Sequence, residues 1–159
     1  MLDPTITCFK QEFDRFLGFI EEQIVMCPEA AWTERVGDTP FWLHLLHTLG
    51  CIEYYARPHG APLKQTAFPR DVVRLRALPE GIMNKAEMTV LMADMRAVAH
   101  AYFETQSTQT LADKNLTMSE HMGKDCTNVQ ALIALIRHNA YHIGCCDSVL
   151  RMHGLPGVY

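Results

Sequence analysis

The sequence has 159 residues, a length typical of one compact domain, and we expect residues 1–159 to form a single domain. Apolar residues make up 48% and charged residues 20%, a composition that argues against a disordered chain. The 14 basic and 18 acidic residues give a formal net charge of −4. Nonspecific nucleic-acid binding depends on a basic surface, so we expect no nucleic-acid partner.

Two further observations bear on the membrane and on secretion. The longest apolar runs are short, such as residues 131–136, and lie far below the roughly 20 residues that span a bilayer. The first four residues, Met-Leu-Asp-Pro, contain neither a basic start nor an apolar block. We therefore expect a cytoplasmic protein with no membrane partner.

The first predicted helix begins at Asp3-Pro4, a capping acid followed by a proline in the first helical position. Its apolar residues recur in steps of three and four. They are Ile6, Phe9, Phe13, Phe16, Leu17, Ile20 and Ile24. Cys27-Pro28 ends this helix, because the residue before a proline is pushed out of the helical region.

A second helix is predicted from Thr39-Pro40, again a cap followed by a proline, to about Arg57. Prolines and a glycine after residue 57 predict a loop that continues to about residue 70. The following residues, 71–78, predict a short helical turn.

Asn84 with Glu87 three positions later predicts a capping box at the start of the third helix. Its apolar stripe is Met88, Leu91, Met92, Met95, Val98, Ala99, Tyr102 and Phe103. Polar residues 106–114 predict the next loop.

The fourth helix is predicted to begin near Thr127 or Asn128 and to end at His153-Gly154. Glycine followed by the apolar Leu155 indicates a Schellman-type end. No segment shows the alternation of a strand. Four helices with one apolar side each predict an all-α fold, a four-helix bundle with long connecting loops.

The histidines of the second and fourth helices are the candidate metal ligands. His138 and His142 are four positions apart, so they share one helix face about 6 Å apart, a spacing that presents two imidazoles to one metal ion. His47 lies on the best core stripe of the second helix, whereas His44 points inward less reliably. Three imidazoles leave a coordination position open, as in catalytic metal sites.

Two segments carry a family resemblance. Residues 42–49 read Trp-Leu-His-Leu-Leu-His-Thr-Leu, and residues 137–144 read Arg-His-Asn-Ala-Tyr-His-Ile-Gly. This pairing resembles the DinB/YfiT-like superfamily of metal-binding four-helix bundles, over nearly the whole chain in helix order and length. The resemblance implies a metal triad of His47, His138 and His142, a divalent ion such as zinc or nickel, and a homodimer.

Four neighbouring residues are candidates for weaker roles. His44 could replace His47 as a ligand, although a role beside the ligands is favoured. Cys51 and Cys145 could approach the ion as soft ligands, although we favour small packing residues. Arg137 could hold an anionic substrate, although a solvated position is favoured.

The acidic residues do not identify a general base, and no catalytic residue is assigned. Glu53 and Asp147 could orient an imidazole through its second nitrogen, and either could equally be a surface charge.

The leading hypothesis is an enzyme that depends on a divalent metal. An open three-histidine site would activate a low-molecular-weight thiol, as in the S-transferases and isomerases of the resembled superfamily, or water, as in a hydrolase. The alternative is a noncatalytic helical binding module that the metal stabilises. A free coordination position facing a cleft favours the enzyme, and a cysteine or carboxylate closing the coordination sphere favours the module.

Overall fold

The computed structural model describes residues 3–64 and 67–159, and this part of the chain is mostly helical, which confirms the all-α class. Its helices are α1 (Pro4–Met26), α2 (Phe41–Ala56), α3 (Arg70–Val73), α4 (Lys85–Glu104), α5 (Thr108–Ala112), α6 (Leu116–Met122) and α7 (Asn128–Met152). Two strands of two residues each, β1 (Arg35–Val36) and β2 (Thr39–Pro40), pair antiparallel just before α2.

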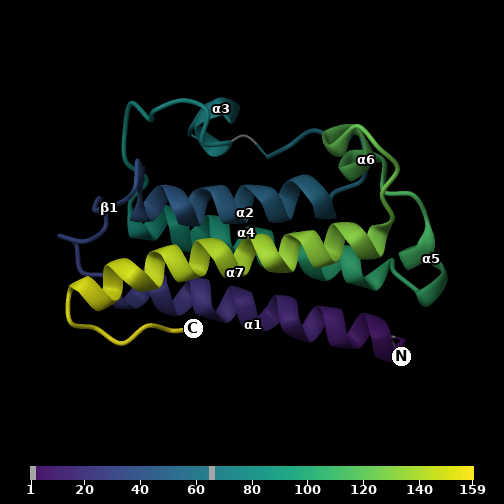
Figure 1. Ribbon diagram of the computed structural model, residues 1–159, viewed down its shortest axis with the longest axis horizontal. Coiled ribbons are helices and arrows are strands. Elements are labelled where there is room, and N and C mark those ends of the chain that lie inside the picture. The colour runs from purple at the N-terminus through teal and green to yellow at the C-terminus, as the bar shows by residue number, and fades with distance from the viewer. Residues whose placement is uncertain (1–2, 65–66) are drawn as a thin grey trace.

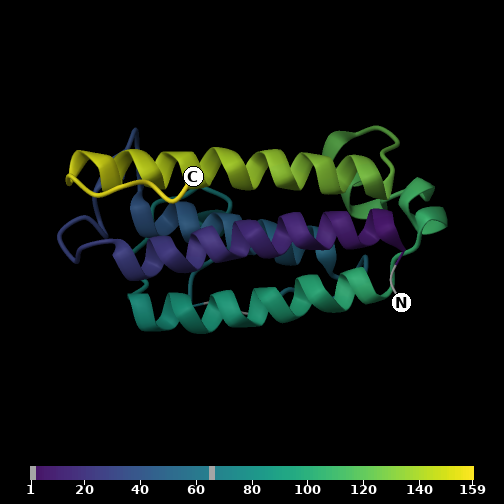
Figure 2. The same ribbon diagram turned by 90° about the horizontal axis from the view of Figure 1, so that it is seen from below.

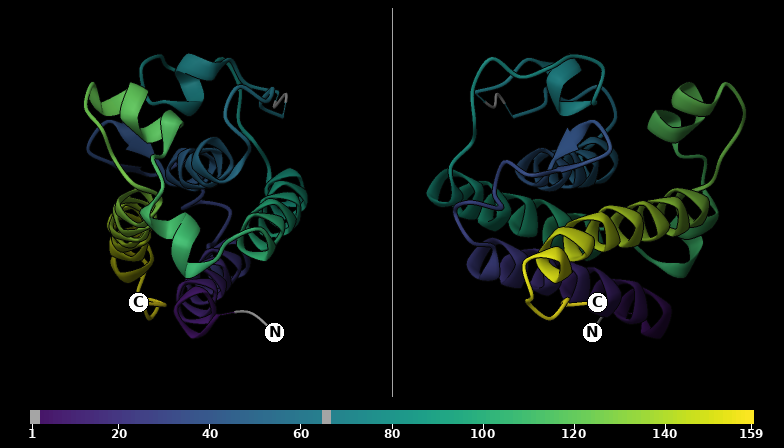
Figure 3. Two further views of the ribbon diagram at one scale, coloured as in Figure 1. Left: turned by 90° about the vertical axis from the view of Figure 1, so that its right-hand side faces the viewer. Right: turned by 60° about the vertical axis from the view of Figure 1, so that its left-hand side comes forward.

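The four long helices α1, α2, α4 and α7 lie side by side along the length of the molecule (Figure 1 and Figure 2). Helix α2 packs against α4 and α7, and α1 packs against the same two helices from the other side. Their apolar faces enclose one core that includes Phe13, Trp42 and Phe103. Helices α3 and α6 both contact α2 and lie on its outer side (Figure 1 and Figure 3).

The predicted boundaries of α1 and α4 are confirmed. The Asp3 side chain accepts a hydrogen bond from the Thr5 N–H, and Cys27 has an extended backbone at the other end of α1. At the start of α4, the Asn84 side chain accepts from the Glu87 N–H while the Glu87 carboxylate accepts from the Asn84 N–H. Local capping chemistry therefore sets where both helices begin.

The end of α7 is also the predicted Schellman motif. Gly154 has a φ of +73°, a left-handed conformation that glycine adopts easily. The Leu155 N–H donates to the Leu150 carbonyl and the Gly154 N–H donates to the Arg151 carbonyl, each over 3.0 Å. These bonds satisfy the last carbonyls of the helix and turn the chain back along it.

The start of α2 differs from the prediction of a Thr39 cap. Thr39 and Pro40 form strand β2, and Pro40 occupies the cap position with no side-chain hydrogen bond. The Phe41 N–H donates to the Glu34 carbonyl over 2.8 Å. Because the preceding hairpin satisfies this N–H group, the helix starts without a capping side chain.

Three short helices depart from the predicted loops. The predicted turn at residues 71–78 is found as α3, which begins one residue earlier and is shorter. Residues 106–114, predicted as a loop, contain α5, and α6 follows where no element was expected. Ser107 and Asn115 cap these two helices. Residues 65 and 66 of the predicted loop before α3 lie outside the described residues.

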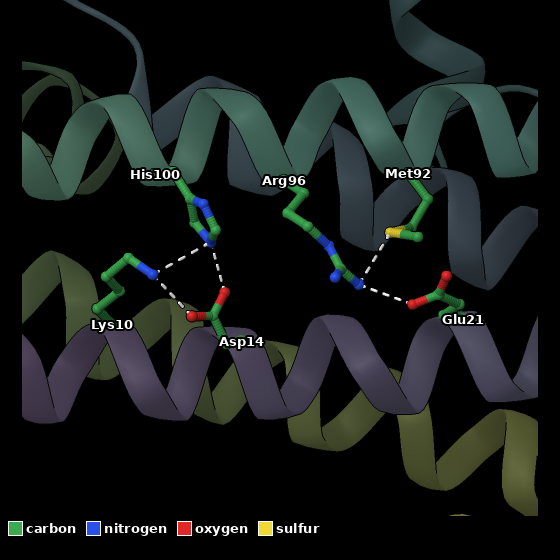
Figure 4. A network of polar contacts seen from close by, with 6 residues as sticks. All are labelled: Lys10, Asp14, Glu21, Met92, Arg96 and His100. Carbon is green, nitrogen blue, oxygen red and sulfur yellow. Dashed lines mark hydrogen bonds and ion pairs between the residues drawn. The ribbon is translucent and has the colours of Figure 1, made fainter.

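Polar contacts join α1 and α4 along their shared surface (Figure 4). Asp14 accepts a hydrogen bond from Lys10 over 2.8 Å and lies 2.5 Å from Nε2 of His100. One turn before His100 in α4, Arg96 donates to Glu21 over 2.8 Å. In the described part of the chain, every helix is too short or too polar to cross a membrane.

Candidate metal centre

Four histidine side chains meet between α2 and α7. The ring centroid of His47 lies 4.8 Å from that of His138 and 4.7 Å from that of His142. The rings of His138 and His142 are 4.5 Å apart. His44 contacts His142 through their Nδ1 atoms, which are 2.8 Å apart. The fold thus brings the histidines of two distant segments into one cluster.

His47 is held in a single orientation by α3. Its Nδ1 atom lies 2.7 Å from the carbonyl oxygen of Val73. A carbonyl oxygen only accepts, so Nδ1 carries the proton and Nε2 carries the lone pair. Nε2 faces Nε2 of His138 at 2.9 Å. Histidines that bind metals commonly donate their other N–H in this way, which aims the lone pair.

Cys51 lies beside these nitrogens, although the sequence analysis favoured a packing role for it. It follows His47 by one helical turn, so it projects from the same face of α2. Its Sγ atom is 3.9 Å from Nε2 of His47 and 3.8 Å from Nε2 of His138. The ligand atoms of these three residues all lie within 4.8 Å of one another, which makes them a group that can hold a metal ion. His142 touches the group through its ring but is not one of the three.

The distances and donor types fit a divalent ion. Two nitrogens bound tetrahedrally to one zinc ion at ~2.0–2.1 Å lie roughly 3.3–3.4 Å apart, a few tenths of an ångström more than the 2.9 Å between His47 and His138, so a small shift of either ring admits the ion. Imidazole and thiolate are donors that zinc and nickel accept. In the described chain, Nδ1 of His138 and Nε2 of His44 are buried without a hydrogen-bond partner. Such unsatisfied atoms are costly in a packed interior and common at functional sites.

Burial keeps the imidazoles of the cluster neutral. It lowers the pKa of His138 to about 4 and that of His142 to about 2, with the nearby His47 as the second cause. Burial also lowers the pKa of His44 to about 4 and that of His47, although the Val73 carbonyl raises the latter. At pH 7 a metal ion therefore competes with few protons for these nitrogens.

The thiol of Cys51, unlike the imidazoles, is protonated at neutral pH. Burial raises its pKa to about 12, and the positive charge of Arg74 opposes this effect only in part. Without a cation the thiol keeps its proton at neutral pH. A metal ion that uses Sγ must therefore displace that proton, whereas one that uses the imidazoles need not.

A cleft of about 610 Å³ opens onto this cluster. Helices α2 and α7 form its floor, and α3 and α6 contribute to its walls. His47, Cys51 and His138 all line it, together with Tyr54 and Tyr141. The ligand atoms thus face a space large enough for a small organic molecule.

Two other candidates from the sequence differ in position. Arg137 lines the cleft and is exposed. Cys145 is half-buried on α7 and does not line it.

The interpretation of Glu53 and Asp147 as surface charges or imidazole partners is wrong. Both are buried. Asp147 accepts from the side chain of Gln23 over 2.8 Å and from the N–H groups of Val158 and Tyr159 over 3.0 and 2.9 Å. It therefore fixes the C-terminal segment against α7. Glu53 accepts from the backbone N–H of Lys64 and holds the loop after α2.

Other residues of the site were missed by sequence reasoning. The carbonyl of Val73 orients His47, and Gly50 lets α3 approach, since a Cβ at Gly50 would lie 2.5 Å from Cγ1 of Val73. The role of a backbone carbonyl cannot be predicted from the type of its side chain. The sequence did contain one signal that this segment belongs to the site. Residues 70–76 read Arg-Asp-Val-Val-Arg-Leu-Arg, and the three arginines of this short stretch all line the cleft.

No protein-family model matches this chain, and no curated protein matches its sequence. Its resemblance to the DinB/YfiT-like superfamily thus stays an expectation from the two histidine segments.

Proposed function

We propose that this protein is a divalent-metal-dependent enzyme of the DinB/YfiT-like four-helix-bundle type, with its ion bound by His47, His138 and His142. One observation carries the proposal. The Nε2 atoms of His47 and His138 converge to 2.9 Å, with His47 fixed from behind, on the floor of a cleft of about 610 Å³. Structural metal sites are closed by protein ligands, whereas catalytic sites keep one position open to substrate.

Two of the three proposed ligands, His47 and His142, have a neighbour that can set their tautomer. Val73 accepts the Nδ1 proton of His47. Nδ1 of His142 is 2.8 Å from Nδ1 of His44, and a proton on His142 in this contact leaves Nε2 of His142 free as a ligand. His44 is then a positioning residue that accepts a hydrogen bond from the ligand.

The surroundings of the cluster favour a thiol over water as the activated group. A bound divalent ion supplies positive charge that lowers the pKa of a water or thiol. Metal-dependent hydrolases commonly use a carboxylate as general base, and no aspartate or glutamate lines the cleft in the part of the chain that the structure describes. A thiol that ionises beside the ion is already the nucleophile. The thiol-dependent transferases and isomerases of the resembled superfamily agree with this choice.

Cys51 supports a second candidate function, a noncatalytic module that the metal stabilises. Its Sγ atom lies 3.8–3.9 Å from both nitrogens and can join His47, His138 and His142 in a closed four-ligand sphere. A closed sphere would leave no position for a substrate.

The test combines metal content with turnover. Purified protein loaded with zinc or nickel and then desalted should hold about one ion per chain by plasma emission spectroscopy, and H47A/H138A should hold none. His153→Ala is the matched control, because His153 pairs with Glu34 away from the cleft. Retention of the ion by H47A/H138A would overturn the site.

Turnover separates the two functions. Metal-loaded protein should convert electrophiles in the presence of low-molecular-weight thiols faster than chelated protein, in a panel that includes hydrolase substrates. Equal rates with and without metal across the panel would favour the stabilised module.

A further inference from the structure

The cleft above the histidine cluster is lined by four arginines. Arg70, Arg74 and Arg76 come from α3 and the turn after it, and Arg137 comes from α7. No carboxylate side chain among the described residues lines the same cleft. The chain as a whole has a net charge of −4, so the positive charge of this cleft is a local concentration.

Three guanidinium groups surround the ring of Tyr54. The Cζ atoms of Arg70 and Arg74 each lie 5.5 Å from its centroid, and that of Arg57 lies at 5.6 Å. Each cation is attracted to the ring, but the three cations repel one another. Within residues 3–64 and 67–159, none of them forms an ion pair with a carboxylate. The described residues thus supply no paired carboxylate for these three cations.

The turn that carries Arg74 and Arg76 has an unusual backbone. Leu75 between them has a φ of +58°, in the left-handed region that favours glycine. The Leu75 N–H donates to the Val72 carbonyl over 3.0 Å, and the Arg76 N–H donates to the Asp71 carbonyl over 2.7 Å. A leucine in this conformation is strained, and such strain concentrates at turns that bind ligands.

The segment that carries these arginines also orients one ligand of the candidate metal centre. Val73 accepts the hydrogen bond of His47, and the next residue, Arg74, is near enough to Cys51 for its charge to act on that thiol. A ligand that contacts Arg74 therefore lies beside the histidine cluster.

We propose that this cleft binds an organic oxyanion, with Arg70 and Arg74 binding its carboxylate or phosphate and Arg137 adding charge from α7. The planar guanidinium group donates two parallel hydrogen bonds to either oxyanion. The apolar body of the molecule lies against the tyrosines of the cleft. The claim that this oxyanion is the substrate rests on the proposed metal-dependent function. The claim that the cleft binds it does not depend on that function.

The test is a titration of the full-length protein followed by NMR amide shifts, first with the metal removed by chelation and then with zinc. The probes are benzoate, phenyl phosphate, inorganic phosphate and the neutral benzamide. At least one of the two aromatic anions should bind roughly tenfold or more tightly than benzamide, with shifts at residues that line the cleft. The tighter of the two identifies the oxyanion. Inorganic phosphate should bind more weakly than phenyl phosphate, and equal affinity would overturn the role of the apolar body.

Variants tie the binding to the arginines. R70Q/R74Q should weaken the tighter aromatic anion at least about tenfold, and Arg137→Gln should weaken it less. Arg35→Gln is the matched control, because Arg35 is exposed in β1 and does not line the cleft. Circular dichroism confirms that each variant is folded. If R70Q/R74Q is unfolded, the affinity of Arg137→Gln and the comparison with benzamide still test the anion site.

The two proposals can fail separately. Anion binding by the metal-free protein together with absence of zinc binding would overturn the enzyme and leave the anion site. Stoichiometric zinc with equal affinity for benzoate, phenyl phosphate and benzamide would overturn the anion site alone.

Discussion

His47 donates a hydrogen bond from Nδ1 to the carbonyl oxygen of Val73 over 2.7 Å, so the orientation of a candidate metal ligand depends on the position of α3. Helix α3 can lie this close to α2 because Gly50, one turn after His47, has no side chain. A Cβ at this position would lie 2.5 Å from Cγ1 of Val73. Gly50 and Val73 together determine where the lone pair of His47 points.

The first prediction concerns Gly50→Ala. The added methyl should push Val73 away and lengthen the bond from His47, since the contact is shorter than atoms tolerate. Loss of a partner that orients a metal ligand typically weakens metal binding about 10–100-fold. We expect a loss of that size, measured by competition with a chromophoric chelator.

Gly18→Ala is the control for this prediction. Gly18 also lies inside a long helix, and a Cβ there would meet nothing within 4 Å. This variant should keep its metal affinity and gain about 0.5–1 kcal/mol of stability from helix propensity. Equal metal affinities of Gly50→Ala and the native protein would show that α3 does not orient His47.

The second prediction concerns His44, which lies 2.8 Å from His142 but is not a proposed ligand. His44→Ala should still bind about one ion per chain, with an affinity reduced about tenfold because His142 loses the partner that sets its tautomer. Plasma emission measures the stoichiometry, and chelator competition measures the affinity. Complete loss of the ion would mean that His44 is itself a ligand.

Local sequence signals predicted the long helices well. The ends of α1 and α7 follow from Cys27-Pro28 and Gly154, and the start of α4 follows from Asn84, because capping depends on only a few neighbouring residues. The short helices α3, α5 and α6 have four to seven residues, too few for a periodic apolar stripe. Their existence depends on packing against distant parts of the chain.

The candidate site likewise has features that local sequence predicted and features that depend on tertiary packing. The spacing of His138 and His142 on one helix and the apolar setting of His47 predicted that their rings would meet, which the structure shows. The approach of Cys51 was one of two alternatives and not the favoured one, and the role of the Val73 carbonyl was not predicted, because both depend on how the helices dock. Such docking depends on tertiary packing, for which no short spacing gives a signal.

The third prediction is a pH dependence of stability that comes from Asp14 in the network of Figure 4. Burial raises its pKa, but the hydrogen bonds from Lys10 and His100 outweigh this, and the pKa lies below its usual 3.8. Ionised Asp14 therefore stabilises the fold above that value, and the contribution disappears as the pH falls through the lowered pKa.

The measurement is the urea midpoint as a function of pH. Asp14→Asn should be less stable than the native protein near neutral pH by up to about 1 kcal/mol, because this ion pair is partly exposed. The difference should shrink below pH ~4. Asp38→Asn is the control, since Asp38 is exposed in the β1–β2 turn. A difference that is constant with pH would contradict the lowered pKa.

The fourth prediction identifies the third protein ligand, by comparing His142→Ala with Cys51→Ser in protein loaded with cobalt. If His142 is the ligand, as proposed, His142→Ala should weaken metal binding at least about 100-fold, since a ligand matters more than the partner that orients it. Cys51→Ser should change affinity little, and the cobalt spectrum of the native protein should lack thiolate-to-metal charge transfer. A charge-transfer band that disappears in Cys51→Ser would instead make Sγ, 3.8 Å from Nε2 of His138, the third ligand.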